Sequence, residues 1–369
     1  MKILILATNH KSLAIKMLAQ SLNKLSASFD ILNPSQLFLM ISNHSKGRNQ
    51  VFDDYTAETI KKVDLQQYDI VIPRIGKDVA FSCEVLKYLE EVFNMKTIQS
   101  SEAISNAFSK IRTSILLRAQ DLRTPKTIYV NRLKNVDTVL KKLSQNQKFV
   151  IKLDKGSKGK QVSIISGIAE TKSVLDTLDS MNQQIIIQEY IDSNGTDIRA
   201  IVIGDQVVAA YQRKSSGKEL RANISTGGEG VKVSLTEEEK EFCVLCAKAV
   251  ELDFAGVDFI KSKNGTYYCI EVNHCPGMNV QKFSPKNIMD EVVSLALKKA
   301  AEPSPKVCTK KNFSTFQKAY NATYNNPDFL RLFDALKGKI VHSKKTGIQS
   351  VIRSKEDLQK LLVSQLEIR

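Results

Sequence analysis

The stretch Gly256–Asn279, GVDFIKSKNGTYYCIEVNHCPGMN, decides how the rest of the chain is interpreted. It holds two runs rich in β-branched and aromatic residues, 257–260 and 266–272, a composition typical of β-strands. Between them, Asn264-Gly265 favours a two-residue hairpin turn, because both turn positions require a positive φ that these residues tolerate. The stretch therefore predicts a β-hairpin.

Three residues of this hairpin carry oxygen atoms suited to a metal ion. Strand side chains alternate with a period of two, so Glu271 and Asn273 point the same way, with Asp258 across the ladder. An oxygen-only set is what a hard cation such as Mg²⁺ takes, usually completed by nucleotide phosphates. The alternative is a set of exposed polar residues on a solvated sheet face, and the hairpin alone does not decide between the two.

Composition places the chain among ordinary globular proteins. Its 369 residues are enough for two or three domains, and it is 42% hydrophobic and 25% charged. The six cysteines form no disulfide pattern for a chain of this size, which indicates a reducing, cytoplasmic compartment. We interpret Cys243-x-x-Cys246 as two small apolar helix residues rather than a metal or redox site. The N-terminus lacks a signal peptide pattern, and no apolar run is long enough to span a membrane.

A net charge of +15 favours an anionic partner such as nucleic acid, a nucleotide, an acidic peptide or a ribonucleoprotein. The alternative is a lysine-rich surface that only keeps the protein soluble. Nucleic-acid binding would need aromatic residues that stack on bases. The candidates Phe313, Phe316, Tyr320 and Tyr324 are spaced by three or four residues, which more simply makes one apolar helix face. We therefore do not expect nucleic acid as a partner.

The first 100 residues begin with a β-α-β pattern. A buried-type strand at 1–9, a helical pattern and a second strand near 29–32 predict a parallel sheet covered by helices. The turn after the first strand lacks the G-x-G-x-x-G sequence, so dinucleotide binding is not supported. The polar segment 42–67 is expected to be a loop or an irregular insertion, and a strand at 68–73 and a helix at 79–93 complete this region.

The middle of the chain predicts a basic helix at 102–119 and a strand at 148–153. That strand runs directly into DKGSKGKQV, a loop that contains Gly156, Ser157 and Gly159. Glycine allows backbone N–H groups to close over phosphates, although a plain hairpin turn explains the loop equally well.

Further strands are expected at 184–190, 197–203 and 206–211. A helix then begins after Thr236, whose capping box is completed by Glu239. Beyond the linker signal Pro303-Ser304-Pro305, a small basic module is expected at 306–369, with helical patterns and a strand at 347–353.

A set of sequence blocks stands in order along the chain: VIPRIG, VIKLDKGSKG, QEYI, GTDIRAIVIGDQVVAAYQR, LRANIS, AGVDFI and IEVNHCPG. With this set the chain resembles the RimK-like branch of the ATP-grasp ligases, from residue 1 to about residue 300. The resemblance implies an ATP-grasp fold of α/β and α+β class, in which two α+β subdomains clamp ATP and a parallel-sheet domain precedes them. The implied N-terminal domain, subdomain A, subdomain B with the metal site and basic C-terminal extension are 1–100, 101–185, 186–302 and 303–369.

The resemblance also implies a reaction and its residues. ATP phosphorylates a carboxylate to an acylphosphate, and an amine attacks this to give an amide, as in acid–amino-acid ligases. Lys110 and Lys152 would contact the α- and β-phosphates, and Asp197 the ribose hydroxyls. The implied ATP-binding residues are Lys110, Lys152, Gly156, Ser157, Gly159, Glu189, Tyr190 and Asp197, of which Glu189 and Tyr190 form the adenine-side hinge. The implied catalytic residues are Arg213, Arg221 and Asn223, and the implied ligands of two Mg²⁺ ions, with Mn²⁺ as an alternative, are Asp258, Glu271 and Asn273.

Several positions depart from the family pattern. Lys160 replaces a third glycine of the loop, and the segment NISTGG at 223–228 lacks a basic His-Arg pair near the acceptor pocket. The run at 278–282 also differs, and His274 replaces a small residue. We interpret His274 as a neighbouring contact rather than a catalytic group. ATP chemistry is therefore expected, while the acceptor stays open.

The function expected from the resemblance is addition of an amino acid such as glutamate to a peptide or protein C-terminus. A ribosomal protein is among the candidate acceptors, a homo-oligomer is expected, and a membrane partner is not. Alternatives within the enzyme class are ligation of a small metabolite, an amino-group carrier protein or a ribosomal peptide. The non-enzyme alternative is a nucleotide-binding regulator without turnover, against which the intact set of metal ligands and arginines argues.

Overall fold

The computed structural model describes most of the first 302 residues and a few positions beyond them. The described ranges are 1–41, 50–53, 61–130, 136–154, 162–180, 184–214, 229–284 and 287–302, then 330, 334, 337, 340–342 and 349–351. The chain divides into two compact units, Met1–Pro303 and Ser304–Arg369. In the second unit, β16 (Ile340–His342) and β17 (Gln349–Val351) pair antiparallel, and β17 lies within the strand expected there. The division of the first unit near residues 100 and 185 remains our proposal.

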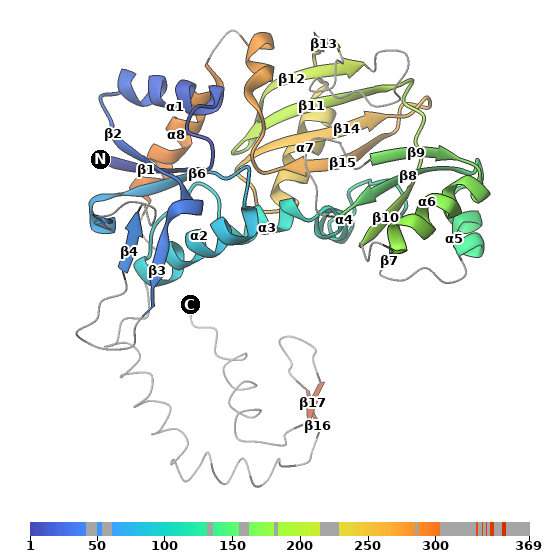
Figure 1. Cartoon of the computed structure of the whole chain (residues 1–369), viewed down its shortest axis with the longest axis horizontal. Coiled ribbons are helices and arrows are strands. Elements are labelled where there is room, and N and C mark those ends of the chain that lie inside the picture. The colour runs from blue at the N-terminus through green and yellow to red at the C-terminus, as the bar shows by residue number, and fades with distance from the viewer. Residues whose placement is uncertain are drawn as a thin grey trace. The chain divides into compact units, whose positions relative to one another are not determined.

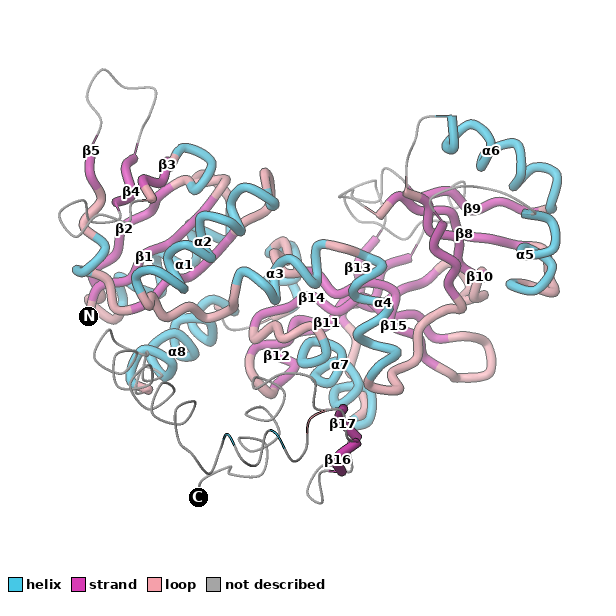
Figure 2. The backbone as a smooth tube through the Cα atoms, turned by 90° about the horizontal axis from the view of Figure 1, so that it is seen from below, coloured by secondary structure: helices cyan, strands magenta, loops and turns pink. Residues whose placement is uncertain are grey.

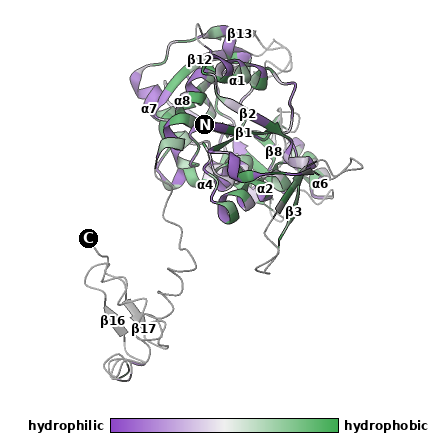
Figure 3. Cartoon of the chain, turned by 90° about the vertical axis from the view of Figure 1, so that its left-hand side faces the viewer, coloured by the Kyte–Doolittle hydropathy of each residue, from purple (hydrophilic) through white to green (hydrophobic). Residues whose placement is uncertain are grey.

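The N-terminal sheet is parallel, as the β-α-β pattern predicts. Its elements and the helices on it are β1 (Lys2–Ala7), α1 (Leu13–Lys24), β2 (Ser28–Leu32), β6 (Ile70–Arg74), α2 (Val79–Phe93) and α8 (Ile288–Ala301). The strand order is β2-β1-β6. On β1, Ile3 and Ile5 pack with α1 and α8, whereas Leu4 and Leu6 pack with α2, so helices cover both faces (Figure 1). The helices around this unit carry hydrophobic and hydrophilic segments side by side (Figure 3).

The polar segment at 42–67 is not a loop throughout, and that expectation is wrong for part of it. A small antiparallel sheet includes β3 (Phe38–Met40), β4 (Gln50–Asp53) and β5 (Lys61–Lys62), followed by a 3₁₀ turn at Leu65–Gln67. Phe38 and Phe52 stack with ring centroids 4.8 Å apart, and Val51 is fully buried in the core, so apolar contacts contribute to this sheet. Residues 42–49 and 54–60 of this segment lie outside the described residues.

The single helix expected at 102–119 is two helices, α3 (Ser101–Phe108) and α4 (Lys110–Ala119). Ser109 interrupts them with an extended backbone at φ −89° and ψ 116°, and its side chain caps α4 by accepting the Arg112 N–H. The two helices run from the N-terminal sheet to the antiparallel sheets (Figure 2).

The first antiparallel sheet has the strand order β7-β10-β8-β9. Its elements are β7 (Thr127–Val130), α5 (Val136–Leu143), β8 (Lys148–Leu153), β9 (Val162–Ser166), α6 (Ile168–Ser180) and β10 (Ile185–Glu189). Leu140 of α5 and Leu175 of α6 share a buried cluster with Phe149 and Ile187 of the strands. The two helices therefore cover one face of this sheet.

The second antiparallel sheet carries the hairpin and has the order β13-β12-β11-β14-β15. Its elements are β11 (Thr196–Ile203), β12 (Gln206–Lys214), β13 (Glu229–Lys232), α7 (Glu237–Ala249), β14 (Phe254–Lys261) and β15 (Tyr267–Asn273). Thr236 and Glu239 form the predicted capping box at the start of α7. Cys243 and Cys246 are buried free thiols on α7, as expected of small apolar residues, and pack in one cluster with Val257.

The hairpin of β14 and β15 is confirmed, but its turn type is not the predicted one. Only Gly265 has a positive φ, at 85°, and its N–H donates to the Ser262 carbonyl over 2.9 Å. The Ser262 N–H in turn donates to the Thr266 carbonyl over 2.8 Å, which closes a three-residue loop rather than a two-residue one. The Asn264 side chain accepts the Thr266 N–H at 3.2 Å and the Ser262 hydroxyl at 2.5 Å, which stabilises this longer loop.

Among the described residues, no helix has the length and apolar character that crossing a membrane requires.

Candidate active site

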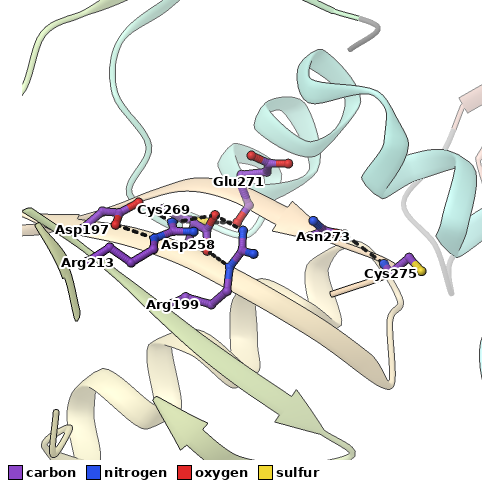
Figure 4. A network of polar contacts seen from close by, with 8 residues as sticks. All are labelled: Asp197, Arg199, Arg213, Asp258, Cys269, Glu271, Asn273 and Cys275. Atoms are coloured by element: carbon purple, nitrogen blue, oxygen red, sulfur yellow. Dashed lines mark hydrogen bonds and ion pairs between the residues drawn. The ribbon is translucent and has the colours of Figure 1, made fainter. Parts of the chain in front are cut away.

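Four charged side chains of the five-stranded sheet form one hydrogen-bonded group, which we call the Asp–Arg cluster (Figure 4). Arg199 on β11 donates to Asp258 on β14 from Nε to Oδ1 over 2.6 Å and from Nη2 to Oδ2 over 2.5 Å. Arg213 on β12 donates to both oxygens of Asp197, and its Nη2 also lies 3.0 Å from Asp258 Oδ2. The register explains the grouping, since Asp197 stands opposite Arg213 and Arg199 stands opposite Asp258.

The Asp–Arg cluster is buried, so the solvated-face interpretation of Asp258 is wrong. The side chains of Asp258 and Arg213 are 5% and 6% exposed. Burial alone would raise the pKa of Asp258, but the guanidiniums of Arg199 and Arg213 outweigh it and lower the pKa. Burial raises the pKa of Asp197 to about 6, and the negative charge of Asp258 adds to the rise, although Arg213 and Arg199 oppose it. Asp258 is therefore ionised at neutral pH.

A register shift in the hairpin brings Glu271 opposite Asp258. On β14 and β15, Phe259 pairs with Cys269, so an unbroken ladder would place Ile270 opposite Asp258. The ladder is irregular between Asp258 and Phe259, and Glu271 takes that position instead. Residues directly opposite each other in an antiparallel pair share a face, so the two carboxylates belong to one side of the sheet. The Glu271 carboxylate lies outside the hydrogen-bonded cluster (Figure 4).

The end of β15 is held by contacts around Asn273 and His274. Asn273 Oδ1 accepts the Cys275 N–H over 2.9 Å, and His274 Nε2 lies 3.0 Å from the carbonyl oxygen of Ile75. Burial above all lowers the pKa of His274 to about 4, so the ring is neutral and Nε2–H donates to that carbonyl. The ring also packs edge-on against Phe108 at 6.1 Å, which makes His274 a packing contact with the N-terminal region.

Two lysines bring positive charge to the same region. Burial lowers the pKa of Lys152, on β8, to about 8, and the Glu271 carboxylate opposes that shift. Burial also lowers the pKa of Lys110, at the start of α4, with Glu271 and Asp154 opposing it. Both ammonium groups therefore interact with Glu271, and Lys152 also interacts with Asp258. Lys110 Nζ donates a hydrogen bond to the backbone carbonyl of Asp154 over 3.0 Å.

Glu189 and Tyr190 lie at the end of β10, where the hinge was expected. The Glu189 N–H donates to the Lys126 carbonyl over 3.0 Å, and the Glu189 carboxylate accepts the Lys126 N–H over 2.8 Å. The Tyr190 N–H donates to the Lys148 carbonyl over 3.1 Å, and Lys148 Nζ lies 3.8 Å from the centre of the Tyr190 ring. Both N–H groups are engaged within the protein, so other groups of the hinge would have to read a base edge.

The structure therefore groups Lys110, Lys152, Asp197, Arg213, Asp258 and Glu271 through hydrogen bonds and electrostatic contacts. Asn273 follows Glu271 on the same strand, and Glu189 and Tyr190 stand at the end of the other antiparallel sheet. Gly156, Ser157, Gly159, Arg221 and Asn223 lie outside the described residues.

Family models match the chain over two adjoining regions. Residues 1–104 match the RimK PreATP-grasp domain, and residues 107–295 match the RimK-like ATP-grasp domain. The chain belongs to the RimK-like ATP-grasp family. It is therefore a ligase of the ATP-grasp class, as the resemblance of its motifs implied.

Curated relatives of the chain are named probable alpha-L-glutamate ligases. The relative from Legionella pneumophila (strain Corby) is 32% identical over 308 residues, which covers 81% of this chain and 96% of the relative. The relative from Picosynechococcus sp. is 30% identical over 303 residues, which covers 82% of this chain and 97% of the relative.

Solved structures at low sequence identity confirm the ATP-grasp fold. The macrocyclase MdnC from Microcystis aeruginosa, bound with its precursor peptide MdnA, has a TM-score of 0.60 at 14% identity over 81% of this chain and all of MdnC. The ligase PsnB, in complex with a minimal precursor, Mg and ADP, has a TM-score of 0.60 at 17% identity over 82% of this chain and 98% of PsnB. D-alanyl-alanine synthetase A from Vibrio cholerae has a TM-score of 0.58 at 12% identity, over 82% of this chain and 98% of the synthetase.

ATP-grasp enzymes use ATP and Mg²⁺, and the residues of the hairpin fit such an ion. Asp258, Glu271 and Asn273 offer only oxygen donors, and Asp258 is ionised. Among the described residues, Asp258 Oδ2 contacts both Arg199 and Arg213, while Oδ1 accepts from Arg199 alone. Across the described residues, this hairpin included, no group of three or more His, Cys, Asp or Glu side chains is placed to hold a metal, so the candidate set depends on the Asn273 amide oxygen beside the two carboxylates.

Two charged residues of this region, Arg199 and Asp154, were not selected from the sequence as site residues. Arg199 could have been found, because the period of two puts it on the same face as Asp197. Asp154 follows β8 and contacts the N-terminus of α4, 43 residues away in sequence from Ile111. No local pattern indicates such a contact, so Asp154 could not have been found from the sequence.

Proposed function

We propose that the chain is an ATP- and Mg²⁺-dependent carboxylate–amine ligase that adds an amino acid, with glutamate as the first candidate, to the C-terminus of a peptide or protein. The observation that carries this proposal is the pairing of Asp258 with Glu271 beside the Lys110 and Lys152 ammonium groups. Oxygen ligands for a cation next to lysines are what a metal-bound polyphosphate requires. The choice of glutamate is supported by relatives named probable alpha-L-glutamate ligases, which the chain matches over nearly their whole length.

In this proposal each charged group has a task. Lys110 and Lys152 bind the phosphates, and Asp258, Glu271 and Asn273 hold the metal, for which we propose two ions per site. Bound Mg²⁺ would neutralise phosphate charge and so favour attack by the carboxylate oxygen. Arg213, with Arg221 and Asn223 from the segment outside the described residues, stabilises charge on the transferred phosphoryl group and on the acylphosphate. The loop with Gly156, Ser157 and Gly159 would cover the phosphates, and Glu189 and Tyr190 the adenine side.

The pairing of Asp197 with Arg213 is compatible with these roles. Asp197 is proposed to accept hydrogen bonds from the ribose hydroxyls, and each of its oxygens accepts one from Arg213. A carboxylate oxygen has two lone pairs, so each oxygen keeps a second one that a ribose hydroxyl could use beside Arg213.

The proposal is tested by ADP release from ATP in the presence of single amino acids and candidate acceptor peptides, followed by intact mass of the acceptor. The expected product is heavier by one or more amino-acid residues. Loss of one water from a peptide, with no residue added, would instead indicate an internal crosslink, and a small-molecule product would indicate a metabolite ligase. ATP binding without turnover under all conditions would favour the regulator.

Two variants test the metal ligands within the same assay. Glu271→Gln and Asp258→Asn are expected to lower ADP release by more than about 100-fold, because loss of an indirect contact to a metal already costs about 10- to 100-fold. Circular dichroism should show that both variants remain folded. Normal turnover in either folded variant would contradict the metal assignment.

A further inference from the structure

Asp154 makes four contacts that join the end of β8 to the start of α4. Its carboxylate accepts the Ile111 N–H at Oδ1 over 3.1 Å and lies 3.1 Å from the Ser109 hydroxyl at both oxygens. Its backbone carbonyl accepts the hydrogen bond from Lys110 Nζ over 3.0 Å. Asp154 is only 5% exposed, so these contacts are shielded from competing water.

The position of Lys110 requires such a partner. Lys110 is the first residue of α4, where the helix dipole disfavours a cation, and the charge of Lys110 also lowers the pKa of Lys152 by repulsion. A carboxylate at the same helix terminus offsets both the unfavourable dipole and the repulsion between the two lysines. The Asp154 carboxylate stands there, because it accepts a hydrogen bond from the Ile111 N–H in the first turn. Ser109 completes the junction, because its hydroxyl accepts the Arg112 N–H at 3.3 Å while donating to Asp154.

We propose that Asp154 is a positioning residue for phosphate binding, which fixes the start of α4 on the end of β8 and so holds the Lys110 ammonium group close to Lys152. The inference rests on the proposed phosphate-binding role of the two lysines. Asp154 does not touch the nucleotide in this arrangement; it acts through Lys110.

The test is the dissociation constant of AMPPNP with Mg²⁺, measured by calorimetry on the full chain. Asp154→Ala is expected to weaken binding about tenfold, because contacts that order a charged group are worth about that much. Asp154→Asn keeps the shape and one acceptor oxygen and is expected to weaken binding less, and it carries the test if the alanine variant does not fold. The control Asp137→Asn removes an exposed carboxylate, 3.9 Å from Lys172 on the same subdomain, and should leave binding unchanged.

A double-mutant cycle separates positioning from a general structural role. In a Lys110→Met background, Asp154→Ala should change the dissociation constant by less than about twofold, since the group that it positions is already gone. An undiminished tenfold loss in that background would overturn the inference, as would unchanged binding in folded Asp154→Ala. Failure of the unmutated chain to bind AMPPNP would overturn the proposed function itself, and this inference with it.

Discussion

At Asp258 a buried carboxylate is held by two guanidiniums, and the pairing with Arg199 should matter for stability. Arg199→Met would leave Asp258 with Arg213 alone, which is shared with Asp197. Removing one partner of a buried ion pair costs about 3–5 kcal/mol, and because the contact to Arg213 remains, the expected loss in the free energy of unfolding is ~3 kcal/mol. Urea unfolding followed by circular dichroism measures this loss.

The matched control for that variant is Arg118→Met. Arg118 forms an ion pair with Asp121 at the same 2.5 Å distance, but their side chains are 71% and 89% exposed. Exposed pairs contribute less than ~1 kcal/mol, so this variant should change the free energy of unfolding little. Equal losses in the free energy of unfolding for the two variants would show that burial of the Asp–Arg cluster does not strengthen its contribution to stability.

Lys152 gives nucleotide binding a specific pH dependence. Its pKa of about 8 lies below the usual 10.5, mainly because of burial. Phosphate favours the protonated form, so the dissociation constant of AMPPNP should rise about tenfold from pH 7 to pH 9, where about 90% of the free lysine is neutral. Lys152→Met should bind weakly and with no such rise, and calorimetry at the two pH values tests this. A rise of equal size in the variant would assign the effect to another group.

The same shift also affects stability in the nucleotide-free protein. The unfolded chain binds the Lys152 proton more tightly than the folded chain does. The contribution of this residue to stability should therefore increase as the pH rises from about 8 to 10.5.

At the scale of single elements, the contact of α7 with the five-stranded sheet predicts the behaviour of the cysteines. Burial raises the pKa of Cys243 and Cys246 on α7, and Cys269 on β15 is also buried. Thiolates react and buried thiols do not, so these three should resist the thiol reagent DTNB at pH 8 until urea unfolds the chain. Cys275 is partly exposed and should react first among the described cysteines. Mass spectrometry after labelling locates the modified residues, and rapid modification of Cys246 in the folded protein would contradict this packing.

The elements that the sequence predicts well are those with a local cause. The capping box of Thr236 and Glu239, the parallel opening and the hairpin at 256–279 depend on residues that are near neighbours. The break at Ser109 is accompanied by a contact with Asp154, and the register shift that brings Glu271 opposite Asp258 by a hydrogen bond from the Cys269 N–H to the Arg123 carbonyl, both of which involve other parts of the chain. For the same reason, the types of the site residues were predictable, but the pairing of Asp197 with Arg213 was not.

At the scale of the whole molecule, the division after Pro303 separates two roles in the proposed reaction. The family models end at residue 295, and the second unit begins at Ser304. Deleting 306–369 should leave the affinity for AMPPNP unchanged but lower the rate with a macromolecular acceptor, because the removed segment is strongly basic and suits an acidic partner. The comparison uses calorimetry for the nucleotide and intact mass against time for the acceptor. An undiminished rate of acceptor modification in the truncated chain would show that the extension has no role in substrate use.

The measurement that tests the central claim most directly follows the oxygen atoms of the reacting carboxylate. An acceptor peptide labelled with ¹⁸O in its C-terminal carboxylate is incubated with the chain, ATP, Mg²⁺ and glutamate, and the released phosphate is analysed by mass. If the carboxylate attacks the γ-phosphoryl group and the amine then displaces phosphate, each amide formed should yield one phosphate that carries one ¹⁸O, together with ADP. Amide formation with unlabelled phosphate, or with AMP and pyrophosphate, would contradict an acylphosphate mechanism.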